Sequence, residues 1–213
     1  MVKKKTNEEA TTVEIPALET RVVNIEIVGD SDLICHSWSD KAKKEMLNKQ
    51  MKKAEKGKDP KDPERDYRES LYWLNADGHR IPAGSGDPND HKYFGFPSAA
   101  FRLAAVRGCK NVKIAMTDGR AAFYVMDEFV LIKHKGIDKR EDMVRLQKKT
   151  ADIRYRAAFR DWSATLKVRY NVNCLTVEQI VNLFEQAGFG VGVGEWRPER
   201  NGSFGTFHVK KEK

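Results

Sequence analysis

The last third of the chain follows a pattern that few folds can accommodate: a strand, a helix, a glycine-rich loop and a second strand. Residues 163–171, SATLKVRYN, alternate apolar and polar side chains, which is typical of a strand with one buried face. Residues 176–188, TVEQIVNLFEQAG, place apolar side chains at helical spacing, and residues 203–209, SFGTFHV, predict a closing strand. This order predicts two strands of one sheet that are connected over a packed helix.

The ends of these elements carry their own signals. Thr176 and Gln179 have the spacing of a capping box, and Gly188 stands where a helix stop is expected. Lys167 and Arg169 fall on the polar face of the strand that precedes the helix. Because this strand is expected to lie near the closing strand, we predict that both cations line the same groove as the glycine-rich loop.

The glycine-rich loop excludes the common nucleotide-binding loops by its spacing. Residues 188–205 contain six glycines, which follow a helix and open a strand. A dinucleotide-binding fingerprint instead follows a strand and opens a helix. The sequence also lacks the G-x-x-x-x-G-K-[ST] string of a P-loop and the HRD and DFG strings of a protein kinase.

Two interpretations of the loop remain. Backbone N–H groups of glycine can meet phosphates, arginine can donate two hydrogen bonds to a phosphate, and a tryptophan ring can stack on a base. The predicted nucleic-acid site then comprises Gly192, Gly194, Trp196, Arg197, Arg200 and Gly202. In the alternative, Gly188 ends the helix, Asn201 and Gly202 form a turn, and the loop only approaches its own chain.

The rest of the chain adds strands, a helix and long polar segments. Residues 21–28, RVVNIEIV, alternate as a half-buried strand, and residues 96–108, FPSAAFRLAAVRG, predict a helix. Two strand-like runs, 121–126 and 129–133, are separated by two acidic residues and predict a β-hairpin. The fold class is therefore α+β.

Two segments look like insertions into this fold. Residues 39–92 are polar and rich in glycine and proline, and they include an exposed helix over 39–56. Residues 134–161 are basic and have no clear apolar period. Residues 1–19 predict a flexible tail, so the expected organisation is a single domain over 20–213 with two large insertions.

The charge of the chain favours a polyanionic partner. Its formal net charge is +8, which promotes attraction to nucleic acid without proving it. The candidate phosphate contacts in the second insertion are Arg140, Arg145, Lys148, Lys149, Arg154 and Arg156. The alternative for this run is a solvated surface with local ion pairs.

Two motifs resemble the RAMP superfamily, the RNA-binding backbone and processing subunits of CRISPR effector complexes. Gly192-x-Gly194, a basic and aromatic tip, and Gly202-x-x-Gly205 resemble the glycine-rich loop of that family, although the second glycine pair is three residues apart and not two. The stretch from Phe96 to Arg102, FPSAAFR, resembles the start of a helix that follows a long insertion in the backbone subunits. The resemblance covers most of 20–210, and the whole chain also looks similar to stand-alone proteins of bacteriophages and prophages.

The resemblance implies a fold, a ligand and an assembly. The implied fold is a ferredoxin-like (RRM-like) antiparallel sheet with two large insertions and a C-terminal glycine-rich loop. The implied function is sequence-independent binding of single-stranded nucleic acid, RNA ahead of DNA. Copies of the protein are expected to line up along the strand, and other effector-complex subunits are possible partners.

Two other classes of function remain open. One is an endoribonuclease that uses His36 as a general acid or base, or Asp30 and Asp32 in a metal-assisted reaction. The other is a phage structural or anti-defence protein that binds a host protein complex. Binding-type subunits of the resembled family need no catalytic residue, so a non-enzyme is the prediction.

No cofactor or metal is expected. The three cysteines, Cys35, Cys109 and Cys174, lack CxxC spacing and predict reduced thiols. The start of the chain shows no apolar signal region and no run is long enough to cross a bilayer, so we expect a cytoplasmic protein, in the bacterial host if a phage encodes it.

Overall fold

The computed structural model describes residues 15–53, 60–145 and 151–211, and it confirms the α+β class. All strand pairs are antiparallel. The strands of the main sheet lie in the order β10 (Phe207–Val209), β1 (Thr20–Gly29), β9 (Ser163–Asn171), β6 (Phe129–Lys133), β4 (Phe94–Pro97) and β3 (Tyr72–Trp73), and β5 (Phe123–Val125) also pairs with β9.

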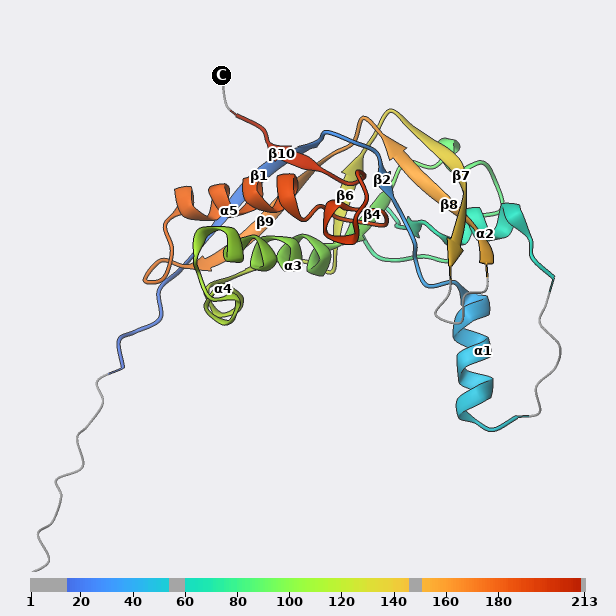
Figure 1. The fold of residues 1–213 in the computed structure, drawn as a ribbon, viewed down its shortest axis with the longest axis horizontal. Helices are drawn as coiled ribbons and strands as arrows, with labels where there is room; N and C mark the ends of the chain where they lie inside the picture. The colour runs from blue at the N-terminus through green and yellow to red at the C-terminus, as the bar shows by residue number, and fades with distance from the viewer. Residues whose placement is uncertain (1–14, 54–59, 146–150, 212–213) are drawn as a thin grey trace, which may run out of the picture.

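Three helices cover one face of this sheet (Figure 1). They are α3 (Ser98–Gly108), α4 (Met116–Ala122) and α5 (Val177–Gly190), and α3 lies against α5. The capping box of Thr176 and Gln179 is confirmed at the start of α5. On the other face of the sheet, Lys167 and Arg169 of β9 are exposed.

A second, smaller sheet packs at the other end of the molecule (Figure 1). Its strand order is β2 (Leu33–Ile34), β8 (Ala151–Arg160) and β7 (Gly136–Arg145), and α2 (Pro63–Glu69) packs against β8. Helix α1 (Asp40–Gln50) projects away from the rest and buries none of its residues. Short 3₁₀ turns are formed by Pro88–Asp90, Cys109–Val112 and Pro198–Arg200.

One core serves both sheets. Ile25 and Leu166 of the main sheet belong to the same buried cluster as Phe101 of α3 and Phe159 of β8. At the junction, Trp162 is buried beneath Gly29, where a Cβ atom would lie 2.2 Å from the indole Nε1. A side chain at Gly29 would therefore displace the indole, so the junction of the two sheets depends on this glycine.

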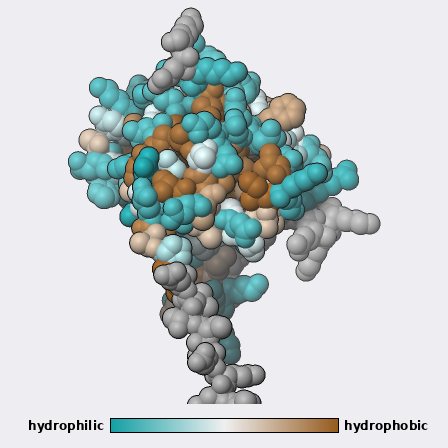
Figure 2. All heavy atoms as spheres, turned by 90° about the vertical axis from the view of Figure 1, so that its left-hand side faces the viewer, coloured by the Kyte–Doolittle hydropathy of each residue, from teal (hydrophilic) through white to brown (hydrophobic). Residues whose placement is uncertain are grey.

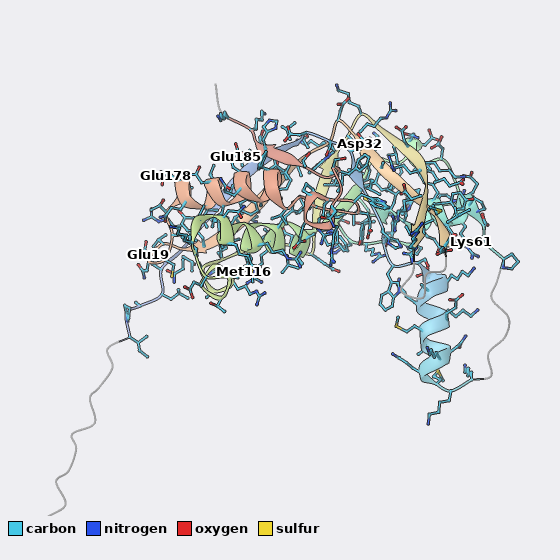
Figure 3. The ribbon with its side chains drawn as sticks, in the orientation of Figure 1. Glu19, Asp32, Lys61, Met116, Glu178 and Glu185 are labelled. Atoms are coloured by element: carbon cyan, nitrogen blue, oxygen red, sulfur yellow. The ribbon has the colours of Figure 1, made fainter. Side chains whose placement is uncertain are left out.

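At the end of the molecule away from the second sheet, apolar side chains reach the surface. Figure 3 places Glu19, Met116 and Glu178 there, and Figure 2 looks onto this end and shows apolar side chains that reach the surface between hydrophilic ones. Ile114 and Val177 are partly buried residues that pack on the edge of the core. Among the described residues, no helix is long and apolar enough to cross a membrane.

The predicted hairpin over 121–133 is wrong. Strands β5 and β6 pair with successive parts of β9, both antiparallel, so they run in the same direction as one interrupted strand. At the interruption, Asp127 has a φ of 65°. The backbone N–H and the hydroxyl of Ser98 donate to the carbonyls of Glu128 and Asp127, so the start of α3 holds the break open.

Three smaller predictions also need correction. Helix α5 does not stop at Gly188 but continues to Gly190, and Gly188 instead allows close approach of Phe207, whose carbonyl oxygen would lie 1.8 Å from a Cβ. The closing strand is shorter than 203–209, because Gly205 donates to the Asp32 carbonyl before β10 begins. The segment 134–161, which was expected to have no clear apolar period, contains two ten-residue strands, β7 and β8.

Candidate nucleic-acid interface

The glycines of the C-terminal loop allow close approach of the chain to itself. A Cβ at Gly202 would lie 1.7 Å from the carbonyl oxygen of Trp196, and a Cβ at Gly205 would lie 1.7 Å from that of Val193. Gly192, Gly194 and Gly205 also have positive φ angles of 69°, 81° and 65°. These positions accept glycine only, because a side chain would be strained and would overlap backbone atoms.

The backbone N–H groups of the loop are largely used within the chain. Gly192 donates to Ala187, Gly202 donates to Arg197, and Gly205 donates to Asp32. These groups were expected to face phosphates. Their hydrogen bonds match instead the alternative in which the loop serves its own fold.

Arg197, one of the two loop arginines in the predicted site, fastens the loop. Its guanidinium donates to the carbonyl of Gly194 at 2.9 Å and to the carboxylate of Glu199 at 3.0 Å. The same carboxylate accepts a hydrogen bond from Arg107 of α3 at 2.6 Å. By contrast, Arg200 is exposed and has no side-chain partner among the residues that the structure describes, and the Trp196 side chain is 39% exposed.

A cluster of arginines lies where the loop meets the second sheet. The register places Arg140 of β7 opposite Arg156 of β8 and Asp142 opposite Arg154, so these four side chains share one face of the hairpin. We call them the arginine face. The loop packs on it through Phe204, whose ring lies 4.6 Å from the guanidinium of Arg140.

Arg156 is the buried centre of the arginine face. Its side chain is 3% exposed, and it lies 3.6 Å from carboxylate oxygens of both Asp142 and Glu195. Its Nε and Nη1 atoms have no hydrogen-bond partner among the described residues. Burial lowers the pKa of Arg156, whereas the two carboxylates oppose this effect.

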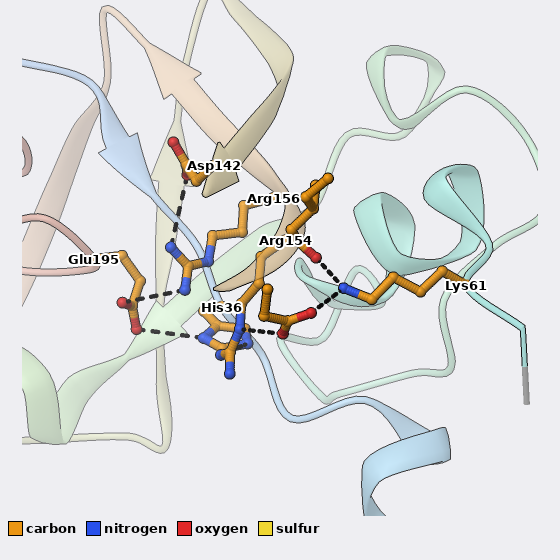
Figure 4. Close-up of polar contacts among 8 residues, drawn as sticks. His36, Lys61, Asp142, Arg154, Arg156 and Glu195 are labelled. Atoms are coloured by element: carbon orange, nitrogen blue, oxygen red, sulfur yellow. Dashed lines mark hydrogen bonds and ion pairs between the residues drawn. The ribbon is translucent and has the colours of Figure 1, made fainter. Parts of the chain in front are cut away.

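His36 connects the arginine face to the loop (Figure 4). It follows β2, and its Nδ1 lies 3.4 Å from a carboxylate oxygen of Glu195, while its Nε2 lies 3.4 Å from Nη1 of Arg154. The contact with His36 and the charge of Arg156 hold the pKa of Glu195 below its usual value. His36, Glu195 and Arg154 are all partly exposed, at 36%, 41% and 33%.

Further ion pairs leave the cluster positive. Arg154 lies 3.5 Å from Asp152, which also binds Lys61 from the other insertion. The cations are Lys61, Arg140, Arg154 and Arg156, and the carboxylates are Asp142, Asp152 and Glu195, so four positive charges face three negative ones. Sequence reasoning missed Lys61, Asp152 and Glu195, because each sits in a charged segment that no pattern links to the others.

A cavity of about 220 Å³ opens beside His36. Pro97 and Ala100, from the stretch that begins α3, line one side, and Gly192 and Gly194 line another. The two motifs that carry the family resemblance therefore meet across one cavity, although they lie far apart in the sequence.

The other predicted residues are scattered. Lys167 pairs in register with Asn24 and Arg169 with Val22, on the exposed face of the sheet, whereas the loop packs near Gly29 and α3. The structure therefore does not bring these two cations to the loop. Arg145 is exposed at the end of β7, and Lys148 and Lys149 lie outside the described residues.

The two candidate nuclease aspartates differ in their partners. The Asp30 carboxylate lies 2.6 Å from Nδ1 of His208, whereas the partner of Asp32 is bound to its backbone carbonyl, which accepts a hydrogen bond from Gly205, and its carboxylate has no partner among the described residues. Within the described ranges, no group of three or more His, Cys, Asp or Glu side chains is arranged to hold a metal ion. Cys35, Cys109 and Cys174 are free thiols.

Comparison with known proteins gives likeness of fold alone. No protein-family model and no curated protein matches the sequence. A chain in the cryo-EM structure of the type III-B Cmr-beta bound to cognate target RNA is similar at a TM-score of 0.50 and 11% identity, over 90% of this chain and 59% of that one. Cmr6 from Pyrococcus furiosus matches at a TM-score of 0.39 and 10% identity, over 91% of this chain and 100% of that one.

Of these two, the chain of the Cmr-beta structure is the one that supports a shared fold. The protein spans less than two thirds of the length of the Cmr-beta chain that it matches.

Proposed function

We propose that this protein binds single-stranded nucleic acid, RNA ahead of DNA, without regard to base sequence, and that several copies align along the strand. The observation that carries the proposal is the arginine face, where partly exposed Arg154 stands beside buried Arg156. Arg154 is one-third exposed, and the cations of the cluster outnumber its carboxylates by one, which suits the phosphate backbone.

The fold supports the same proposal. The strand order β10, β1, β9, β5, with α3 and α5 on one face, supports the ferredoxin-like sheet that we infer. The structural neighbour with a TM-score of 0.50 comes from an assembly bound to target RNA. Membership in the RAMP superfamily and a phage origin stay predictions.

Alignment of copies along a strand has its own support. Helix α1 buries none of its residues, and Met46 and Leu47 on it and Met51 at its C-terminal cap are 46%, 54% and 55% exposed. Such a helix suits contact with a neighbouring copy. Light scattering of the protein with RNA of increasing length should then show masses that rise in steps of one protomer.

The test is fluorescence anisotropy with labelled single-stranded RNA, single-stranded DNA and duplex DNA of about 30 nucleotides, at about 50 mM and about 200 mM salt. We expect RNA to bind most tightly, and salt to weaken every complex. Arg154→Gln should weaken RNA binding by about tenfold, the equivalent of about 1.4 kcal/mol.

The matched control is Arg160→Gln. Arg160 lies six residues along the same strand and pairs with Asp138, so its replacement removes one charge away from the cluster. If Arg154→Gln and Arg160→Gln lose the same affinity for RNA, the effect comes from net charge alone. If the wild-type protein binds these nucleic acids with a dissociation constant above about 10⁻⁴ M, the proposal is wrong.

A second candidate function is cleavage of the bound RNA, and the contact between His36 and Glu195 favours it. In such a reaction one of the two groups takes the proton of a 2′-hydroxyl, the oxygen attacks the adjacent phosphorus, and the other group protonates the 5′-oxygen that leaves. The products are a 2′,3′-cyclic phosphate and a 5′-hydroxyl. Incubation of labelled RNA with EDTA, for wild type and His36→Ala, tests it: RNA that stays intact with wild type excludes the activity.

A further inference from the structure

We propose that the cavity beside His36 takes one unstacked nucleobase of the strand that the arginine face binds. The inference rests on the proposed function and adds a separate site to it. The cavity has a volume of about 220 Å³ and is lined by parts of β3, β4, α3, the loop and the segment after β2.

The walls of the cavity suit a flat ring. Tyr72 and Phe96 are aromatic side chains in edge contact at 5.8 Å, and α3 lines the cavity with Ala100 and Ala104 beside Leu103 and Arg107. Burial raises the pKa of Tyr72 to about 12, so its hydroxyl stays neutral at ordinary pH. Unstacked bases bind in such places by stacking on aromatic rings and by burial of their faces.

The position of the cavity connects it to the phosphate site. His36 lines the cavity and also lies 3.4 Å from Nη1 of Arg154. A phosphate held at Arg154 therefore lies across the imidazole from the cavity. A nucleotide has its base and its phosphate on opposite sides of the sugar, so a single nucleotide can reach both places.

The charges at the rim explain why the base type should not matter. Arg107 and Arg197 both hydrogen-bond to Glu199, and His36 lies against Glu195. Because these groups are already paired, few are free to read the edge of a base. The cavity therefore binds the ring face that all bases share, which agrees with sequence-independent binding.

The experiment compares two ligands of about 30 units: oligouridine and a chain of abasic ribose phosphates of the same length. Wild type should bind oligouridine about tenfold more tightly, because only oligouridine offers a base to stack. Ala100→Leu fills the cavity with an aliphatic side chain. We expect it to bind oligouridine about as weakly as the abasic chain, with the affinity for the abasic chain unchanged.

The control is Ala99→Leu, the same change at an exposed neighbour on α3, outside the cavity lining. It should bind both ligands as wild type does. Leu103→Trp, at a cavity residue that is 44% exposed, gives a second variant that is expected to fold if Ala100→Leu does not.

The outcomes separate the two proposals. If wild type binds neither ligand, nucleic-acid binding itself is wrong. If wild type binds both ligands equally well, or if both cavity variants keep the preference for oligouridine, the strand is bound by its phosphates only and the nucleobase site is wrong.

Discussion

The glycine-rich loop and the arginine face lie in contact, yet they differ in how completely their polar groups are satisfied. In the loop, the N–H groups of Gly192, Gly202 and Gly205 and the guanidinium of Arg197 are bonded within the chain. On the arginine face, Nε of Arg140 and two nitrogens of Arg156 have no hydrogen-bond partner among the described residues. The polar groups of the loop are therefore satisfied within the chain, whereas the arginine face keeps three buried nitrogens without a hydrogen-bond partner among the described residues.

The largest effect expected from this comparison is on stability. Gly205→Ala puts a Cβ into the carbonyl of Val193 at a φ of 65°, so we expect the free energy of unfolding to fall by about 4 kcal/mol. Urea denaturation measures it. Gly78→Ala is the control, because Gly78 also has a positive φ, of 81°, but faces open space, and it should cost about 1 kcal/mol. Similar losses at the two sites would mean that the loop is not closely packed.

The next effect concerns the buried charge. Arg156→Met removes the cation between two carboxylates and leaves Asp142, which is 9% exposed, with Arg140 as its remaining cation. We expect a loss of about 3 kcal/mol in the free energy of unfolding. The double variant Arg156→Met, Asp142→Leu should recover most of this loss. A single variant as stable as wild type would show that the arginine is not needed for folding.

The third prediction separates the two regions directly. Arg197→Ala removes the hydrogen bonds to Gly194 and Glu199, and it should lower the free energy of unfolding by about 1–2 kcal/mol. Its affinity for RNA, measured on folded protein, should change less than twofold. Arg154→Gln should instead lower the affinity for RNA and leave the free energy of unfolding nearly unchanged. A large loss of affinity in Arg197→Ala would show that this guanidinium contacts the strand directly.

The elements differ in how well the sequence alone predicts them. The strand β9 and helix α5 were predictable, since Leu166, Val168, Ile180 and Phe184 all follow the periods of their elements. Strand β7 was not predictable, because it carries charged residues on both faces and no apolar period marks it. Strand β8 was missed although its sequence alternates: Ala151, Ile153, Tyr155, Ala157 and Phe159 are apolar, and Asp152, Arg154 and Arg156 lie between them.

The remaining features depend on contacts between residues far apart in the sequence, so the sequence alone did not predict them. The break between β5 and β6 depends on two hydrogen bonds from Ser98, which no local pattern reveals. The candidate site depends on Glu195 and His36, which stand 159 residues apart. His36 was recognised as a candidate from its residue type, but its partners came only from the fold.

The smallest effect is a dependence of stability on pH. The pKa of Glu195 is lower in the folded protein than its usual value of 4.5, first because of His36. Its contribution is therefore complete above about pH 4.5 and is lost as the pH falls through the lower folded value. Glu195→Gln should be less stable than wild type at pH 7 by under about 1 kcal/mol, because the side chain is partly exposed. The difference should vanish near pH 3, and a constant difference in urea denaturation across this range would contradict the assignment.

Helix α1 buries none of its residues and stands apart from both sheets. Its sequence is therefore free to change without cost to the core, so among related chains we expect it to diverge faster than β1 or β9. For the same reason it is a suitable place to graft an affinity tag or a fluorophore, which would report on binding from a position that the folding of the domain does not depend on.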